Sequence, residues 1–278
     1  MIDTMLVVVA TEMEVEPFLE YMSRNAVRRQ PAYRAPGSIA KFLSYYIDER
    51  EVDVLITGVG MTATALQVAS LLSHRRASGE GNYVLAINAG IAGSFTENYP
   101  LGTPVEVVSD SFEDFGAENG SGKFLSVFDM GLLEKNQPPF DEEGILQNPN
   151  FGFFGEYVGV HGVTVNKALG RKRVIERLKK RFEGREPHLV VETMESAAFF
   201  LACRAFNQDF SCVRVISNYV GVRDKRKWDL PFALEELNDI IRYNVFEDFL
   251  THWGPDENFK GDDGSEFGYG DEDIIFLI

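Results

Sequence analysis

Residues 189–228 carry the pattern of a strand, a helix and a second strand in immediate succession. The helix begins near Met194, and its small and apolar residues recur at i, i+3, i+4, i+7, i+8 and i+11, so they form one continuous apolar face. Apolar runs at 189–191 and 210–217 predict the flanking strands. Such a crossover is typical of parallel strands joined by a right-handed connection, and it predicts an α/β protein.

Polar residues stand where these elements end. Glu195 opens the predicted helix and Asn218 closes the second strand, so we expect both at the carboxyl edge of the sheet, where open α/β folds bind ligands. Glu195 also has a structural interpretation, as an acid that complements the helix dipole. Arg214 lies in the middle of the apolar second strand, and a buried guanidinium needs a partner. Glu14, Glu192 and Glu195 are the candidate partners.

Composition favours one large domain. The 278 residues are 45% hydrophobic, and no Pro/Ser/Gly-rich linker precedes about residue 250. We therefore expect a catalytic domain over 1–250 and an acidic C-terminal extension over 251–278, which holds eight acids and one lysine. The net charge of −16 argues against nucleic acid and anionic membranes as partners.

The metal, redox and targeting signals are weak. The two cysteines, Cys203 and Cys212, form no CxxC motif, so we expect them to be reduced. Asp3 interrupts any leader and the apolar run 5–10 is too short to span a membrane, which predicts a cytoplasmic protein. We expect no metal site because the four histidines are scattered; they are His74, His161, His188 and His252.

A second acidic element follows the first strand. The run 5–10 is fully apolar, as in strands buried on both faces, and leads into Glu12 and Glu14 and then a helix over 15–25. These acids too have a structural interpretation at a helix start. The other expected strands are 40–46, 52–57, 83–88, 104–108 and 157–165, and the other expected helices end near 74 or cover 171–185 and 231–250.

Glycine-rich turns follow two of these strands. GVGMTA at 58–63 matches a dinucleotide fingerprint, but the next strand ends in Asn88 rather than in an acid that could hold a ribose hydroxyl. We therefore expect no NAD and no other cofactor, and the glycines instead let the backbone approach a ligand closely. NAGIAGS at 88–94 repeats the pattern one strand later.

Five segments in order resemble the nucleoside phosphorylase/nucleosidase superfamily: ATEMEVEPF, TGVGMTATA, NAGIAGSF, VETMESAAF and VRVISN. The resemblance runs from about residue 5 to about 250 and implies a three-layer α/β/α sandwich with a central mixed sheet. GVTVN at 162–166, LSVFDMGLL at 125–133 and SNYVGVRD at 217–224 are similar to the futalosine hydrolase family. That family cleaves futalosine into hypoxanthine and dehypoxanthine futalosine in menaquinone biosynthesis.

The resemblance implies residue roles. Glu14, rather than Glu12, would activate water, and Glu195 would accept hydrogen bonds from the ribose 2′- and 3′-hydroxyls. Met194 would pack on the ribose and Gly90 would line the water site. The other implied substrate-binding residues are Ile91, Ala92, Val165, Asn166, Thr193, Ser217 and Arg223.

The substrate's carboxyphenyl arm would need a cation and an apolar pocket. Arg223 is the candidate cation, although it could belong to a solvated turn, and Gly221-Val222 replaces the family's more frequent Glu-Pro before it. Phe112 and Phe115 would line the pocket, across a homodimer interface, or would pack in the core. The implied partners are a small nucleoside and further copies of the chain.

Asn218 carries the expectation on the base. Its amide complements the O6 and protonated N7 of a 6-oxopurine, whereas adenine-specific members of the superfamily have Asp here. A methylthioadenosine/adenosylhomocysteine nucleosidase is therefore the second hypothesis. A phosphorylase is third, because a carboxylate at residue 14 would repel phosphate. A catalytically silent nucleoside-binding protein is the alternative from another class.

Overall fold

The computed structural model describes residues 2–37, 40–47, 49–155, 157–184, 189–222 and 224–249. Within these residues, ten strands form one sheet and two more form a short hairpin. The strands are β1 Thr4–Val9, β2 Val27–Arg29, β3 Lys41–Ile47, β4 Arg50–Ile56, β5 Leu85–Ser94, β6 Pro104–Phe112, β7 Gly116–Glu118, β8 Phe124–Ser126, β9 Leu146–Gln147, β10 Val158–Thr164, β11 Val190–Thr193 and β12 Phe210–Tyr219.

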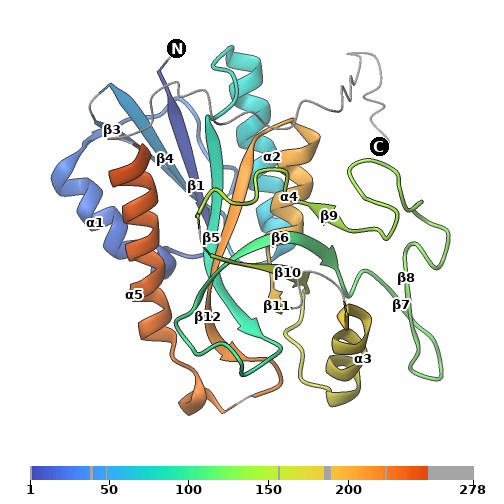
Figure 1. Ribbon diagram of the computed structural model, residues 1–278. Helices are drawn as coiled ribbons and strands as arrows, with labels where there is room; N and C mark the ends of the chain where they lie inside the picture. Colours follow the sequence, from blue (N-terminus) through green and yellow to red (C-terminus); the bar gives the residue numbers. More distant parts are fainter. Residues whose placement is uncertain are drawn as a thin grey trace.

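Helices cover both faces of the sheet, as Figure 1 shows. The α-helices are α1 Glu16–Asn25, α2 Met61–Ser78, α3 Lys172–Phe182, α4 Ser196–Ala205 and α5 Leu230–Ile241. Helices α1 and α5 pack on one face, and α2 and α4 on the other. The expected three-layer α/β/α sandwich with a mixed sheet is confirmed.

The central strand β1 shows why the layers form. All six of its residues are buried, as the apolar run predicts. Leu6 and Val8 join the core under α2 and α4, and Met5, Val7 and Val9 join the core under α1 and α5. Alternation along one strand therefore supplies both hydrophobic cores.

The sheet order is β11-β10-β6-β12-β5-β1-β4-β3-β2. Strand β11 also pairs with β5, so five strands close into a ring. Strands β11 and β12 are consequently not neighbours: β11 runs antiparallel to β5, whereas β12 runs parallel to it. The expected parallel pairing across the 189–217 crossover is wrong, because β12 inserts between β5 and β6 instead of beside β11.

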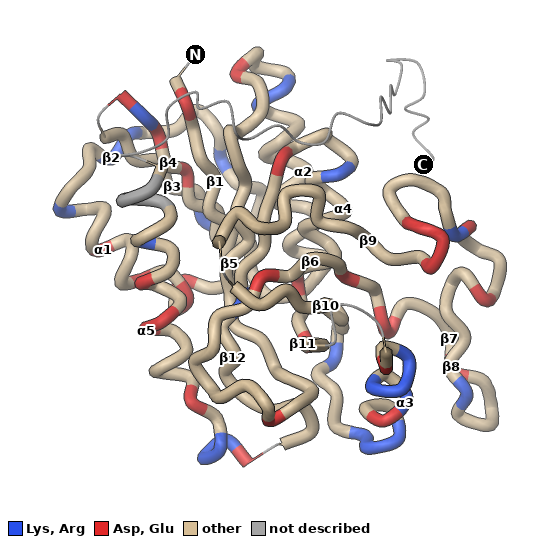
Figure 2. Tube along the Cα trace, in the orientation of Figure 1, with Lys and Arg blue, Asp and Glu red and all other residues tan. Residues whose placement is uncertain are grey.

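Two strands, β5 and β6, extend further than their apolar patterns predict. Strand β6 continues to Phe112 through alternating polar residues, and β5 continues through its glycines to Ser94. The basic segment at 171–185 forms α3, and Figure 2 shows its lysines and arginines gathered there. No helix in the described ranges is long and apolar enough to cross a bilayer. The acidic segment 251–278 lies outside the described residues.

Candidate active site

Glu14 lies in a 3-10 turn, Glu12–Glu14, directly after β1. Its side chain is 8% exposed. Oε2 accepts hydrogen bonds from the backbone N–H of Ala10 (3.1 Å) and Thr11 (2.8 Å) and from the Thr11 hydroxyl (3.1 Å). Burial raises the pKa of Glu14, and the nearby charge of Glu195 raises it further, while the Thr11 bonds and Arg214 lower it. The turn thus presents an oriented carboxylate whose proton affinity is increased.

Helix α5 fixes this turn from the far end of the chain. The Asn238 amide donates to the Glu14 carbonyl at 3.2 Å and accepts from the Phe18 N–H at 3.1 Å. Asn238 is itself buried. One side chain therefore satisfies backbone groups on both sides of the turn and holds Glu14 in place.

Gly90 in β5 leaves the space in front of the carboxylate. A side-chain carbon built on Gly90 would lie 3.1 Å from Glu14 Oε1 and 3.6 Å from Arg214 Nε. Arg214 Nε is buried and has no hydrogen-bond partner within the described part of the chain. A carboxylate and a guanidinium thus both approach the backbone of β5 at Gly90.

Glu195 is the N-cap residue of α4. Its Oε1 accepts a hydrogen bond from the Gly60 N–H at 2.9 Å. Gly60 has φ +97°, in the region that favours glycine, and it starts α2. The glycine turn at 58–60 therefore approaches a site carboxylate with its backbone. The charge of Glu195 acts on Glu14, so the two acids belong to one site.

The antiparallel pairing of β11 explains how Glu195 reaches this position. Val191 pairs with Ser94 and Glu192 with Gly93, so the chain after β11 runs back along β5 toward Gly90. The course of β11 thus brings Glu195 toward Gly90, and the expected reason for its position, an edge shared with parallel strands, is wrong for β11.

Asn218 lies near the end of β12, opposite Gly93. Its Nδ2 is 3.0 Å from the position of a side-chain carbon on Gly93, and its Oδ1 accepts from the Ser217 hydroxyl at 3.1 Å. A register shift between Ile216 and Asn218 re-aims the strand here. The Asn218 side chain is half-buried. Because Ser217 donates to its Oδ1, its NH₂ group points away from the Ser217 hydroxyl.

The ends of β10 and β11 contribute the buried wall. Val165 and Thr193 are buried, and the Val165 N–H donates to the Thr193 carbonyl at 3.0 Å. Met194 follows, half-buried and adjacent to Glu195. These residues continue the surface on which the two carboxylates lie.

Other expected residues divide into three groups. Ile91 and Ala92 share β5 with Gly90. Asn166 is exposed, and its backbone and side chain both donate to the Asp114 carboxylate, at 2.7 and 3.2 Å, so its printed contacts are with the loop after β6. Arg223 lies outside the described residues.

Arg214 has different direct partners from those expected. Its guanidinium donates to the Asn88 carbonyl (2.9 Å) and amide oxygen (2.5 Å) and to the Ser196 hydroxyl (2.9 Å), all of which are neutral. Its charge acts on Glu14 and also on Asp110, which sequence analysis missed. Asn88 and Asp110 are polar residues inside apolar strands. This break in the apolar pattern is the sequence signal that could have identified them as neighbours of Arg214.

Glu192 was another candidate partner of Arg214. Its Oε2 accepts from the Leu169 N–H at 2.6 Å.

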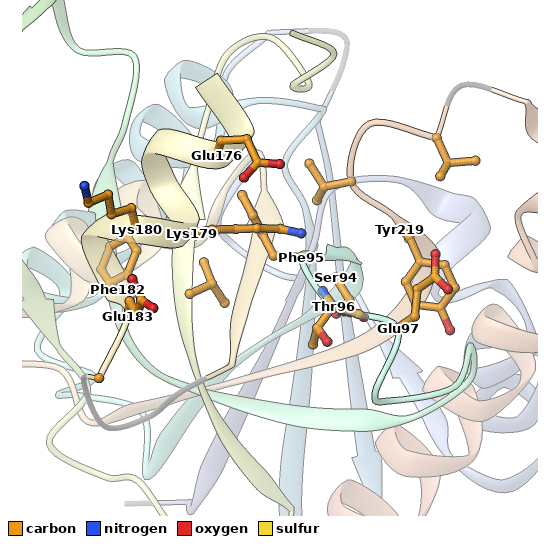
Figure 3. A pocket seen from close by; sticks show the side chains of 14 residues that line it. Ser94, Phe95, Thr96, Glu97, Glu176, Lys179, Lys180, Phe182, Glu183 and Tyr219 are labelled. Atoms are coloured by element: carbon orange, nitrogen blue, oxygen red, sulfur yellow. Dashed lines mark hydrogen bonds between the residues drawn. The ribbon is translucent and has the colours of Figure 1, made fainter. Parts of the chain in front are cut away.

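A cavity of about 830 Å³ lies elsewhere, between α3 and the segments that follow β5 and β12. Figure 3 shows Lys179 and Glu176 extending into it from α3, with Ser94, Thr96 and Tyr219 on the other side. None of the described residues expected at the site lines this cavity. The described residues that line it carry charges of both signs, but they include no guanidinium beside a carboxylate that hydrogen bonds hold in place. We therefore assign the chemistry to Glu14 and the residues around it.

Comparisons with known proteins identify the family of the chain. Residues 4–242 match the model of the family described as the phosphorylase superfamily. A futalosine hydrolase of Streptomyces coelicolor is 29% identical over 91% of this chain and 100% of its own length. Another, of Acidothermus cellulolyticus, is 32% identical over 66% of this chain and 71% of its own. The native structure of the Helicobacter pylori futalosine hydrolase superposes with a TM-score of 0.67 at 14% identity, over 88% of this chain and 98% of that one.

Proposed function

The chain belongs to the phosphorylase superfamily, and we propose that it hydrolyses the N-ribosidic bond of futalosine to hypoxanthine and dehypoxanthine futalosine, a step of menaquinone biosynthesis. The observation that carries the proposal is the close approach of Glu14 Oε1 and the Arg214 guanidinium to Gly90, which has no side chain. A water molecule bound beside Gly90 would donate a hydrogen bond to Glu14 Oε1.

Glu14 would act as the general base. Its Oε2 is saturated by three donors, which leaves Oε1 to take the proton from water. A well-placed general base contributes about 10²–10⁴-fold in rate. The raised pKa of Glu14 increases its proton affinity, which favours its action as a general base.

Glu195 would hold the ribose. Its Oε1 already accepts from Gly60, so Oε2 and the remaining lone pairs would accept from the 2′- and 3′-hydroxyls. Hydrogen bonds to a charged acceptor are worth about 1.5–3 kcal/mol each. The same negative charge stabilises the positive sugar that forms as the bond breaks. Met194 would supply the apolar surface under the ring.

Asn218 would read the departing base. Because Ser217 donates to Oδ1, the Nδ2 group is the donor available for O6 of hypoxanthine. Oδ1 keeps a lone pair for the N7–H that forms as the purine leaves. Asn218 cannot itself supply that proton, so water must do so. An adenine would place its 6-amino group against the amide NH₂, a mismatch between two donors.

The alternatives are less well supported. A phosphorylase would need to bind phosphate beside Glu14, whose anion would repel it. An adenine-specific nucleosidase would lack, at residue 218, the carboxyl that can protonate N7 while it accepts from the 6-amino group. A silent binding protein would have no use for a buried, oriented carboxylate, whose desolvation costs free energy.

Two finer assignments extend the proposal. Phe112 and Phe115 form an edge-to-face pair with centroids 6.2 Å apart, and Phe115 is 49% exposed. An exposed ring beside a half-buried one suits an apolar contact with the substrate arm at an interface between two copies. The arm's carboxylate would be held by a cation, for which Arg223 remains the candidate.

Product analysis tests the function. The purified protein is incubated with futalosine, inosine and methylthioadenosine, with and without phosphate, and the free bases are separated by chromatography. We expect hypoxanthine from futalosine at a rate that phosphate does not change. Faster adenine release from methylthioadenosine, or a requirement for phosphate, would refute the proposal.

A further inference from the structure

Asp110 is a buried carboxyl that the proposed mechanism does not use. It lies on β6 and is 0% exposed. Its partner in register on β10 is Gly162, where a side-chain carbon would lie 2.1 Å from Asp110 Oδ2. Gly162 has no side chain, and the Asp110 carboxyl occupies the space that one would fill.

A chain of hydrogen bonds leads from Asp110 to the start of α4. The Thr164 hydroxyl donates to Asp110 Oδ1 at 2.9 Å. Thr164 Oγ1 also accepts from the Ala197 N–H at 2.9 Å. Since its only proton goes to Asp110, the 2.8 Å contact with Thr193 Oγ1 must be a bond that Thr193 donates.

Thr164 thus replaces the missing cap of the helix. The N-cap residue Glu195 makes no side-chain capping bond, so its carboxylate is free to accept from Gly60 and to face the site. A first-turn N–H needs an acceptor, and a hydroxyl from β10 supplies it. Asp110 orients that hydroxyl.

The same carboxyl is electrostatically connected to Arg214. The charge of Arg214 and the Ser196 hydroxyl, which accepts from Arg214 Nη2, both lower the pKa of Asp110, although burial raises it to about 7. Asp110 Oδ2 is buried and has no hydrogen-bond partner within the described chain.

We propose that Asp110 is a positioning residue: through Thr164 it fixes the first turn of α4 and so places Glu195 against the ribose. This inference rests on the proposed function for its kinetic consequence. The structural part of the inference, that Asp110 keeps the first turn of α4 ordered, can be measured without substrate.

Glu106 provides the matched control. It is also on β6 and fully buried, with its pKa raised by burial, but its carboxylate accepts from Ser211 and Gly152 rather than from the α4 network. Asp110→Asn and Glu106→Gln therefore make the same chemical change on one strand. Thr164→Val removes the Thr164 hydroxyl and keeps the Asp110 carboxyl. It tests the same hydrogen bond if the Asp110→Asn protein folds poorly.

The kinetic test is a double-mutant cycle with Glu195→Gln on whichever purine nucleoside the wild type cleaves. We expect Asp110→Asn to lower kcat/KM about tenfold to hundredfold in the wild-type background, as for a catalytic group displaced by a fraction of an ångström. In the Glu195→Gln background the same change should cost less than about threefold. Equal losses in both backgrounds would overturn the proposal.

Hydrogen exchange supplies the second readout. Asp110→Asn and Thr164→Val should accelerate amide exchange in the first turn of α4, whereas Glu106→Gln should not. Unchanged exchange there would overturn the inference even if the enzyme is active. A wild type that cleaves none of the nucleosides would instead refute the proposed function, and exchange would still decide the role of Asp110.

Discussion

Glu14 Oε1 lies 3.1 Å from the position that a side-chain carbon on Gly90 would occupy. The contact is tighter than ordinary van der Waals packing, and the Glu14 turn is held by both Thr11 and Asn238. The carboxylate therefore depends on a glycine in the neighbouring strand for its room.

Gly90→Ala should lower kcat/KM by about tenfold to hundredfold, because the methyl group displaces the carboxylate and fills the proposed water volume. Steady-state kinetics measure the loss. Gly120→Ala is the control, since nothing lies within 4 Å of a carbon built there. Full activity of the Gly90 variant would place the water elsewhere.

Glu14→Gln should abolish turnover, a loss of about 10²–10⁴-fold, and keep substrate binding. Calorimetric titration with substrate separates binding from rate. Glu12→Gln, two residues earlier and exposed, should retain activity, since Glu12 pairs with Lys41 on the surface. Substantial residual rate in Glu14→Gln would refute the base assignment.

Glu195→Gln should move the acidic limb of the kcat/KM profile to lower pH. The charge of Glu195 raises the pKa of Glu14, so its removal lowers that pKa, and the base stays ionised in more acidic solution. The profile is measured on the residual activity. A limb that stays in place, or moves to higher pH, would show that the two carboxylates do not interact.

Asn218→Asp should shift the preference from 6-oxopurine toward 6-aminopurine nucleosides by about two orders of magnitude in the ratio of kcat/KM values. A carboxyl accepts from the 6-amino group and, when protonated, donates to N7. Ser217 can still donate to it, so its position should be kept. An unchanged ratio would mean that another group reads the base.

Asp53→Asn should stabilise the protein increasingly as the pH rises. Burial raises the pKa of Asp53 from 3.8 to about 7, so the folded state binds the extra proton between these values, and wild-type stability falls as pH rises through that window. The gain should be absent near pH 4 and reach its full size above pH 7, as measured by chemical denaturation. Asp129→Asn should show no such gain, since a hydrogen bond from Ser126 lowers the pKa of Asp129. A pH-independent effect at Asp53 would contradict the raised pKa.

The positions of Glu14, Glu195 and Asn218 could be predicted because each stands where an apolar run stops. Local hydrophobic patterns are sufficient to mark such strand ends. That the three meet at one ligand remains a prediction. The expected reason, one shared parallel edge, is incomplete, because β11 runs antiparallel to β5 and pairing register between distant strands leaves no local pattern.

The environment of Arg214 could be predicted only in part. A buried guanidinium indicated a charged partner, but its bonds go to Asn88 and Ser196, and the compensating carboxyl of Asp110 stands on another strand. Polar residues in β6 resembled a strand end, so the prediction stopped at residue 108. Side chains that pair across a hundred residues can be assigned only once the topology is known.

Asn238 makes the final position of the Glu14 turn depend on a distant part of the chain. The side chain that ties down the Glu14 carbonyl is translated 224 residues after it. During synthesis the turn therefore has its local Thr11 bonds first, and it gains the Asn238 anchor only when helix α5 docks.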